Sequence, residues 1–264
     1  MLEVSQLQFT YGDKQLFNNV SFKVFQNEHV GLMGPNGCGK TTLMNILAHK
    51  IAPDSGSIAW DATIAFSYLD QHLKVSKDVA IYEYLYDVYA PLFLIEKQMN
   101  ELYDQLGGVD PSLIDKTLEK AERLMQELED KDFYRIKSKI SDVISGLGIN
   151  VSQNRKLAEL SSGQRAKVFL GKMLLEEKKT LLLDEPTNFL DAHHIEWLVR
   201  YLQAYPYGYI VISHDMSFLN KVSDVVLMFE NKQINRYRGN VDKALEQQTQ
   251  ALASYEKQYE KQQQ

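Results

Sequence analysis

The sequence predicts an α/β fold whose parallel sheet is interrupted by a helical insertion. Two apolar runs, residues 181–183 and 209–212, have the composition of buried parallel strands. A third apolar run, residues 29–33, leads through a glycine-rich loop into a helix. Residues 76–146 show helical spacing throughout. With 264 residues, of which 44% are hydrophobic, the chain is long enough for one α/β domain with a sizeable core.

An antiparallel β subdomain is expected at the N-terminus. Residues 2–30 have the pattern of short strands joined by turns, and the clearest turn signal lies at residues 11–13. A second turn at residues 53–56 precedes a strand over residues 64–69. That strand leads to Gln71, which makes this glutamine a candidate site residue.

The insertion is expected to contain an acidic helical hairpin. Apolar residues recur in it at steps of three and four, and a break at residues 107–111 separates two long helical segments. Between Ser76 and Gly146 there are 15 acidic residues and 9 Lys or Arg. The predicted hairpin is therefore negatively charged.

The last third of the chain returns to a βα pattern and ends in a helix. Residues 225–229 and 233–237 are expected to form a closing antiparallel pair of strands. From Val241 to Gln264, apolar residues fall on one helical stripe. This helix ends without a cap, from which we expect that the natural chain continues.

Composition and charge exclude several classes of protein. No apolar run reaches the roughly 18 residues of a membrane helix, and the N-terminus has no signal-peptide pattern. The formal charge of −6 does not indicate nucleic-acid binding over the whole surface. The single cysteine, Cys38, cannot form an internal disulfide. We therefore expect a soluble, cytoplasmic protein.

The phosphate-binding pattern G-x-x-x-x-G-K-[ST] is matched by Gly34-Pro35-Asn36-Gly37-Cys38-Gly39-Lys40-Thr41. Glycines let backbone N–H groups turn toward phosphates, and the helix N-terminus adds positive potential. Lys40 is expected to reach the β- and γ-phosphates of a nucleotide, and the Thr41 hydroxyl to ligate Mg²⁺. The Cys38 thiol is expected to have a lowered pKa at this helix start, unless it packs below the loop and is unreactive.

A buried strand ends in two carboxylates, Asp184 and Glu185, the first of them 144 residues after Lys40. Asp184 is expected to hold Mg²⁺ through water. Glu185 is expected to orient and polarise an attacking water as a general base. Such pairs are common at strand ends, and the preceding phosphate-binding loop favours the catalytic interpretation.

A third motif lies at the start of another predicted helix. Ser161 and Gln164 have the spacing of a capping box for a helix that begins near Arg165. The same geometry presents backbone N–H donors to an anion. The structural and the anion-binding interpretations therefore use the same residues.

The order of these motifs resembles that of ATP-binding-cassette ATPases, from Tyr11 to about Asn240. The resemblance rests on GPNGCGKT, the glutamine of YLDQ, LSSGQ, LLLDEP and the histidine of VISHD. It implies a P-loop NTPase with a RecA-like α/β core, a helical subdomain and an ATPase activity that uses ATP and Mg²⁺. By this resemblance, Gln71 contacts Mg²⁺ and the attacking water, and His214 contacts the γ-phosphate.

The resemblance also implies which residues bind nucleotide and metal. Those that bind nucleotide are Tyr11 (stacked on adenine), Gly34, Pro35, Asn36, Gly37, Cys38, Gly39, Lys40, Thr41, Thr42 and, facing a second cassette, Ser161, Ser162, Gly163, Gln164 and Asp191. Those that hold the metal are Thr41, Gln71 and Asp184. Ser162 departs from the family's LSGGQ, and a side chain there either crowds a phosphate or donates to it.

Two features resemble the ABC-F proteins, soluble twin-cassette ATPases that act on ribosomes. The stretch DEPTNFLD is similar to their DEPTNHLD, with Phe189 in place of histidine. The 89 residues from Gln71 to Leu160 leave room for a hairpin arm at about residues 92–131. Transporter cassettes more often carry Ser or Ala in place of Asn188.

The ABC-F resemblance implies a domain organisation. Residues 1–240 would be the first nucleotide-binding domain, and residues 241–264 the start of a helical linker to a second cassette. The implied partners are ATP, that second cassette (or a second copy of this chain) and the ribosome, through rRNA, tRNA or a ribosomal protein. The protein would then regulate translation or protect the ribosome from antibiotics.

The acidity of the arm complicates binding to RNA, because phosphate contacts normally use Lys or Arg. Either the arm contacts ribosomal protein, or a cluster of Arg135, Lys137 and Lys139 contacts RNA. Three alternatives stand beside the translation factor: the nucleotide-binding subunit of an ABC transporter, a ribosome-bound antibiotic-resistance protein, and a nucleotide-gated scaffold without useful turnover.

Overall fold

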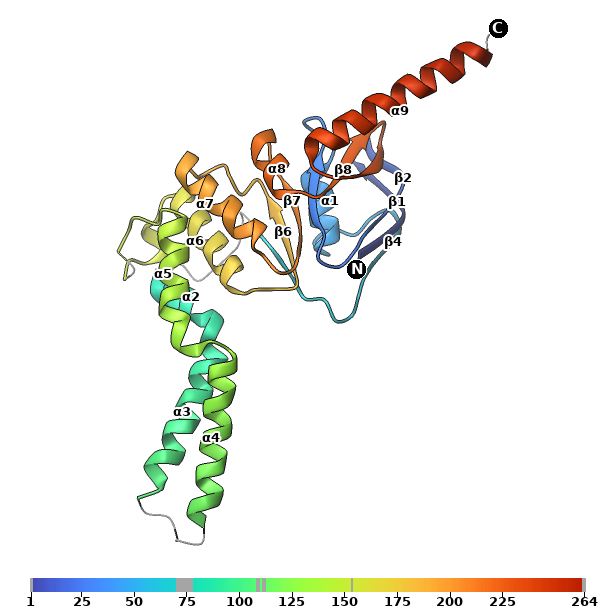
Figure 1. Ribbon diagram of the computed structural model, residues 1–264. Coiled ribbons are helices and arrows are strands. Elements are labelled where there is room, and N and C mark those ends of the chain that lie inside the picture. The colour runs from blue at the N-terminus through green and yellow to red at the C-terminus, as the bar shows by residue number, and fades with distance from the viewer. Residues whose placement is uncertain (1, 70–77, 108–109, 111–112, 153, 263–264) are drawn as a thin grey trace. The chain divides into compact units, whose positions relative to one another are not determined.

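The computed structural model describes residues 2–69, 78–107, 110, 113–152 and 154–262, without the side chains of 252 and 254–262 (Figure 1). It divides into two compact units. The first comprises Met1–Leu73 and Glu177–Gln264, and the second comprises Lys74–Glu176. Among the described helices, none combines the length and the apolar character that crossing a membrane requires.

The first unit begins with a three-stranded antiparallel sheet of order β2-β1-β4. Its strands are β1 (Leu2–Tyr11), β2 (Lys14–Val24) and β4 (Ser55–Trp60). The prediction of short strands in this region was wrong, since β1 and β2 are long and a tight turn joins them. Register shifts in the pairing of β1 with β2, and positive φ angles at Gln6 and Asn19, interrupt the alternating pattern without ending either strand.

A six-stranded sheet of order β5-β6-β7-β3-β8-β9 forms the centre of the first unit. Its strands are β3 (His29–Met33), β5 (Phe66–Tyr68), β6 (Thr180–Asp184), β7 (Gly208–Ile212), β8 (Val225–Glu230) and β9 (Gln233–Arg238). All neighbours pair in parallel except β8 and β9, which form the expected antiparallel pair. The sheet is thus the mainly parallel α/β sheet that the sequence predicts.

The core of the first unit is built on helix α1 (Lys40–Leu47) and the two sheets. Leu43, Met44, Ile46 and Leu47 of α1 are fully buried in one apolar cluster with residues of β1, β2 and β3. Each such side chain contributes about 1.5–3 kcal/mol through burial. The apolar stripe of α1 thus fixes the helix that follows the glycine-rich loop.

Three further helices complete the first unit: α7 (Ala192–Gln203), α8 (Met216–Val222) and α9 (Val241–Gln262). The start of α9 contacts α8, β8 and β9. Asn220 and Asp242 join α8 to α9, because the Asn220 amide donates to the Asp242 carboxylate and accepts from the Asp242 backbone N–H.

The second unit is helical. Its helices are α2 (Ile81–Tyr86), α3 (Ala90–Gln105), α4 (Ile114–Asp130), α5 (Ile136–Gly146) and α6 (Ser162–Leu175). Helices α3 and α4 pack against each other as a hairpin (Figure 1). The unit reaches beyond the helical insertion expected at residues 76–146, because α6 packs on α2 and α5.

Candidate active site

The candidate site lies in the first unit, at one edge of the six-stranded sheet. Strands β3, β6 and β7 are parallel, so their carboxyl ends meet at the same edge, where ligands of open α/β sheets bind. A cavity of about 510 Å³ opens there. It is lined by Tyr11, by the glycine-rich loop and the start of α1, and by Glu185 and His214.

Glycine is required at two positions of the loop. Gly39 has a φ of 110°, and a Cβ there would lie 2.9 Å from the Phe17 ring. Gly34 has a φ of 156°, and a Cβ there would lie 2.6 Å from Cβ of Phe229. A side chain at either position would therefore combine backbone strain with a steric clash.

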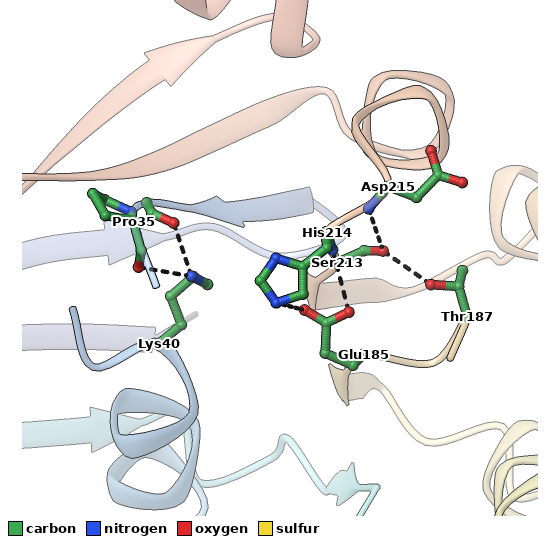
Figure 2. Close-up of polar contacts among 8 residues, drawn as sticks. Pro35, Lys40, Glu185, Thr187, Ser213, His214 and Asp215 are labelled. Atoms are coloured by element: carbon green, nitrogen blue, oxygen red, sulfur yellow. Dashed lines mark hydrogen bonds and ion pairs between the residues drawn. The ribbon is translucent and has the colours of Figure 1, made fainter. Parts of the chain in front are cut away.

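The side chain of Lys40 folds back so that its ammonium group contacts the glycine-rich loop. Its Nζ donates to the carbonyl oxygens of Gly34 at 2.8 Å and Pro35 at 3.0 Å (Figure 2). This places a positive charge beside the backbone of the phosphate-binding pattern. A phosphate held by the loop would lie within reach of that charge.

A second cation lies at the same cavity and was missed by the sequence analysis. Lys14 lines the cavity together with Tyr11, and its Nζ donates to the Gly37 carbonyl at 2.8 Å. The only sequence signal was its place directly after the turn at residues 11–13. That turn joins β1 to β2, which brings Lys14 to the loop.

Asp184 and Thr41 are neighbours at the base of the site. Asp184 ends β6 and is 7% exposed. Burial raises the pKa of Asp184, whereas a hydrogen bond with the Thr41 side chain and the Lys40 charge lower it. Oδ1 of Asp184 is buried without a hydrogen-bond partner among the described residues. A hydroxyl beside a carboxylate with a free oxygen is a donor set that suits Mg²⁺.

Glu185 follows Asp184 in a left-handed backbone conformation, with a φ of 51°. Its N–H donates to the Ile212 carbonyl at 2.9 Å, which anchors it to the end of β7. Its Oε2 accepts from the backbone N–H of His214 at 3.2 Å (Figure 2). Such strained conformations persist where the surroundings fix them, often at active sites.

The other carboxylate oxygen of Glu185, Oε1, lies beside the His214 ring. Nε2 of His214 lies 3.2 Å from Oε1, within ion-pair distance. The angles at this contact do not meet hydrogen-bond geometry, and Oε1 is buried without a hydrogen-bond partner among the described residues. With the His214 ring moved aside, this oxygen would be an acceptor for a water at the site.

Behind this pair, two hydroxyls hold the loops after β6 and β7 together. The side chains of Thr187 and Ser213 are buried and lie within hydrogen-bond distance, 3.0 Å apart. The N–H of Asp215 donates to Oγ of Ser213 at 3.1 Å (Figure 2). These contacts fix the positions of Glu185 and His214.

The remaining predicted nucleotide-binding residues of the first unit divide into two groups. Tyr11, which is 69% exposed, lines the cavity, and so do Asn36, Gly37 and Thr42. Cys38 instead packs partly buried against the apolar core. Burial raises the pKa of its thiol despite the opposing Lys40 charge. The expectation of a lowered thiol pKa is therefore wrong, and the packed alternative fits.

Five other predicted site residues do not line this cavity. Asp191 caps α7, where its Oδ1 accepts from the N–H of His194 at 3.1 Å. Ser161 belongs to the second unit, where it and Gln164 form the predicted capping box of α6, with Ser162 and Gly163 in its first turn. Gln71 lies outside the described residues.

Known proteins that are similar to this chain are ATP-binding cassette proteins, in agreement with a cavity built around a phosphate-binding loop. A family model described as ABC transporter matches residues 17–188. The ABC transporter ATP-binding protein YfmM of Bacillus subtilis is 44% identical over the whole chain, which covers 51% of YfmM. ABC transporter F family member 2 of Arabidopsis thaliana is 31% identical over 90% of the chain, which covers 36% of that protein.

The fold is also that of solved cassettes. A dimeric ATP-binding cassette with bound ADP and Pi superposes with a TM-score of 0.60 at 17% identity, covering 90% of this chain and 98% of that one. The chain spans about half or less of the length of the curated relatives just described.

Proposed function

Because this chain belongs to the ABC transporter family of ATP-binding cassettes, we propose that its cavity binds Mg-ATP and that Glu185 activates the water that hydrolyses it. One observation carries the proposal: a single cavity brings together Tyr11, the glycine-rich loop, Thr41, Glu185 and His214. These groups come from four separate segments of the chain.

The glycine-rich loop and the turn between β1 and β2 would together bind the nucleotide. The backbone N–H groups of the loop would receive the phosphates, and Lys40 would exchange its carbonyl acceptors for phosphate oxygens. The exposed Tyr11 ring would stack on the adenine. ATP titration monitored by Tyr fluorescence of the chain and of a Lys40→Ala variant tests this step, and equal affinities would contradict it.

Thr41 and Asp184 would hold Mg²⁺, with Gln71 as a further ligand. When bound, the ion would neutralise charge on the β- and γ-phosphates. In hydrolysis, water would attack the γ-phosphorus while Glu185 takes a water proton, and the bond to the β-phosphate oxygen would break to give ADP and Pi. His214 would contact the γ-phosphate beside Glu185.

A complete site is proposed to need a second cassette. Ser161, Ser162, Gly163 and Gln164 at the start of α6, together with Asp191, would face the nucleotide of that cassette. Residues 1–240 would be one cassette, and α9 would begin the linker to the next. Turnover per molecule should then fall steeply on dilution of this chain. If turnover per molecule does not depend on protein concentration, the proposal that each site needs residues of two cassettes is wrong.

The longer protein is proposed to be a cytoplasmic ABC-F-type ATPase that binds the ribosome and either regulates translation or protects it from antibiotics. The F-family relative supports the type. The test uses a full-length variant in which Glu185 and the equivalent glutamate of the second cassette are changed to Gln. Its co-sedimentation with ribosomes is compared in Mg-ATP and in Mg-ADP. Pelleting only in Mg-ATP supports the proposal. Recovery with membranes instead would favour the nucleotide-binding subunit of a transporter.

A further inference from the structure

Helix α4 has two lines of side chains at helical spacing, and one of them packs inside the α3–α4 hairpin. The first line contains Thr117, Ala121, Leu124 and Leu128, spaced by four, three and four residues. Ala121 and Leu128 are fully buried, and α4 packs against α3. This is the spacing by which one helix packs along another.

The second line, called here the acidic stripe, contains Asp115, Leu118, Glu122, Met125 and Glu129. Its members are spaced by three, four, three and four residues, so they form one continuous line on the helix surface. All five are exposed, and Leu118 and Met125 each keep 37% of their surface in solvent. Acidic and apolar side chains alternate along it.

The charges of the acidic stripe are not neutralised within the hairpin. Helix α4 has six acidic residues, three of them in the acidic stripe. Outside it, Glu119 lies 3.8 Å from Arg123, and Glu127 lies 2.6 Å from Lys131. None of the three acids of the acidic stripe forms an ion pair with another residue that the structure describes. Three carboxylates without an ion pair therefore lie on the same line of the helix as the exposed Leu118 and Met125.

We propose that the acidic stripe docks a helix of another protein that carries Lys or Arg alternating with apolar residues at the same spacing. Apolar side chains of that helix would cover Leu118 and Met125, and its cations would pair with the three carboxylates. A nucleic acid does not fit, because its phosphates would meet unpaired carboxylates. The proposal does not depend on nucleotide chemistry.

Fluorescence anisotropy with labelled peptides and the full chain tests this surface. The probe is a peptide as long as α4 with Lys and Leu alternating in the three-four spacing. The control ligands are a peptide of the same composition in scrambled order, a peptide in which Glu replaces each Lys, and an RNA duplex. The probe should bind at least about tenfold more tightly than each of the other three.

Two charge-reversal variants distinguish the effect of the acidic stripe on probe binding from the effect of the overall charge. Changing Asp115, Glu122 and Glu129 to Lys should weaken binding of the probe by about tenfold or more. Changing the other three acids of α4 (Glu119, Glu127 and Asp130) to Lys alters the net charge equally and should leave binding within about twofold. Circular dichroism should show unchanged helix content in both.

A third variant, with Leu118 and Met125 changed to Gln, should also weaken probe binding, although it leaves all charges in place. The proposal is overturned if the scramble binds as well as the probe, since attraction would then be only electrostatic. It is also overturned if the probe does not bind, if RNA binds through the acidic stripe, or if the two charge reversals act equally.

Discussion

The backbone N–H of His214 donates to Oε2 of Glu185 at 3.2 Å, although 29 residues separate the two. Through this contact the loop after β7 positions the carboxylate that directly follows β6. The imidazole of His214 is 63% exposed, whereas the Glu185 side chain is only 13% exposed. The histidine thus faces the cavity while the carboxylate is held beneath it.

Replacing Glu185 by Gln should abolish most turnover while preserving nucleotide binding. The amide keeps the acceptor for the His214 N–H but cannot accept a proton from water. The rate of phosphate release should fall by roughly 10²–10⁴-fold, with ATP affinity changed little. Both quantities are measured on the same preparation at a fixed protein concentration. Wild-type turnover in the variant would remove Glu185 from the proposed reaction.

Lys14 is predicted to contribute to ATP affinity. Its Nζ lies on the phosphate-binding loop at 2.8 Å from the Gly37 carbonyl, so a bound triphosphate would meet its charge. Lys14→Ala should weaken ATP binding by about threefold to tenfold, because the contact is exposed to solvent. Lys14→Arg should restore much of it.

Adenosine serves as the control ligand for Lys14, since it carries no phosphate charge. Its affinity should be equal in wild type and Lys14→Ala. If adenosine and ATP lose affinity equally, Lys14 acts only by fixing the loop, and the predicted charge contact is wrong.

Gly39→Ala should destabilise the fold even without nucleotide. The new Cβ would lie 2.9 Å from the Phe17 ring at a φ of 110°. The free energy of unfolding should fall by about 1–3 kcal/mol in urea denaturation. Gly107→Ala is the matched control, because its Cβ would meet nothing closer than 4.0 Å. Similar losses in both variants would contradict the steric explanation.

The Cys38 thiol should react slowly with iodoacetamide in the folded chain. Burial raises its pKa, so at a given pH less thiolate is present than in the chain unfolded in urea. The apparent pKa of alkylation should therefore be higher in the folded state. Because the Lys40 charge lowers this pKa, Lys40→Met should raise it further. A folded-state pKa below the unfolded value would contradict the observed packing.

Local patterns predicted the βα elements and most of the cavity, but the tertiary structure overturned two expectations. The Cys38 prediction failed because the motif specifies where the thiol lies along the loop, whereas its packing depends on residues far away in the chain. The prediction of short N-terminal strands failed because register shifts keep β1 and β2 continuous through residues that resemble turns.

The sequence by itself determined which segments carry the proposed chemistry. The loop from Gly34 to Thr41 and the Asp184–Glu185 pair are recognisable because spacing and residue type are local properties of the chain. Only the tertiary structure decided that Lys14 reaches the loop and that Glu185 rests on His214. Those contacts depend on which strands pair in parallel and on where the turn between β1 and β2 lies relative to the loop. Neither is encoded within a few residues.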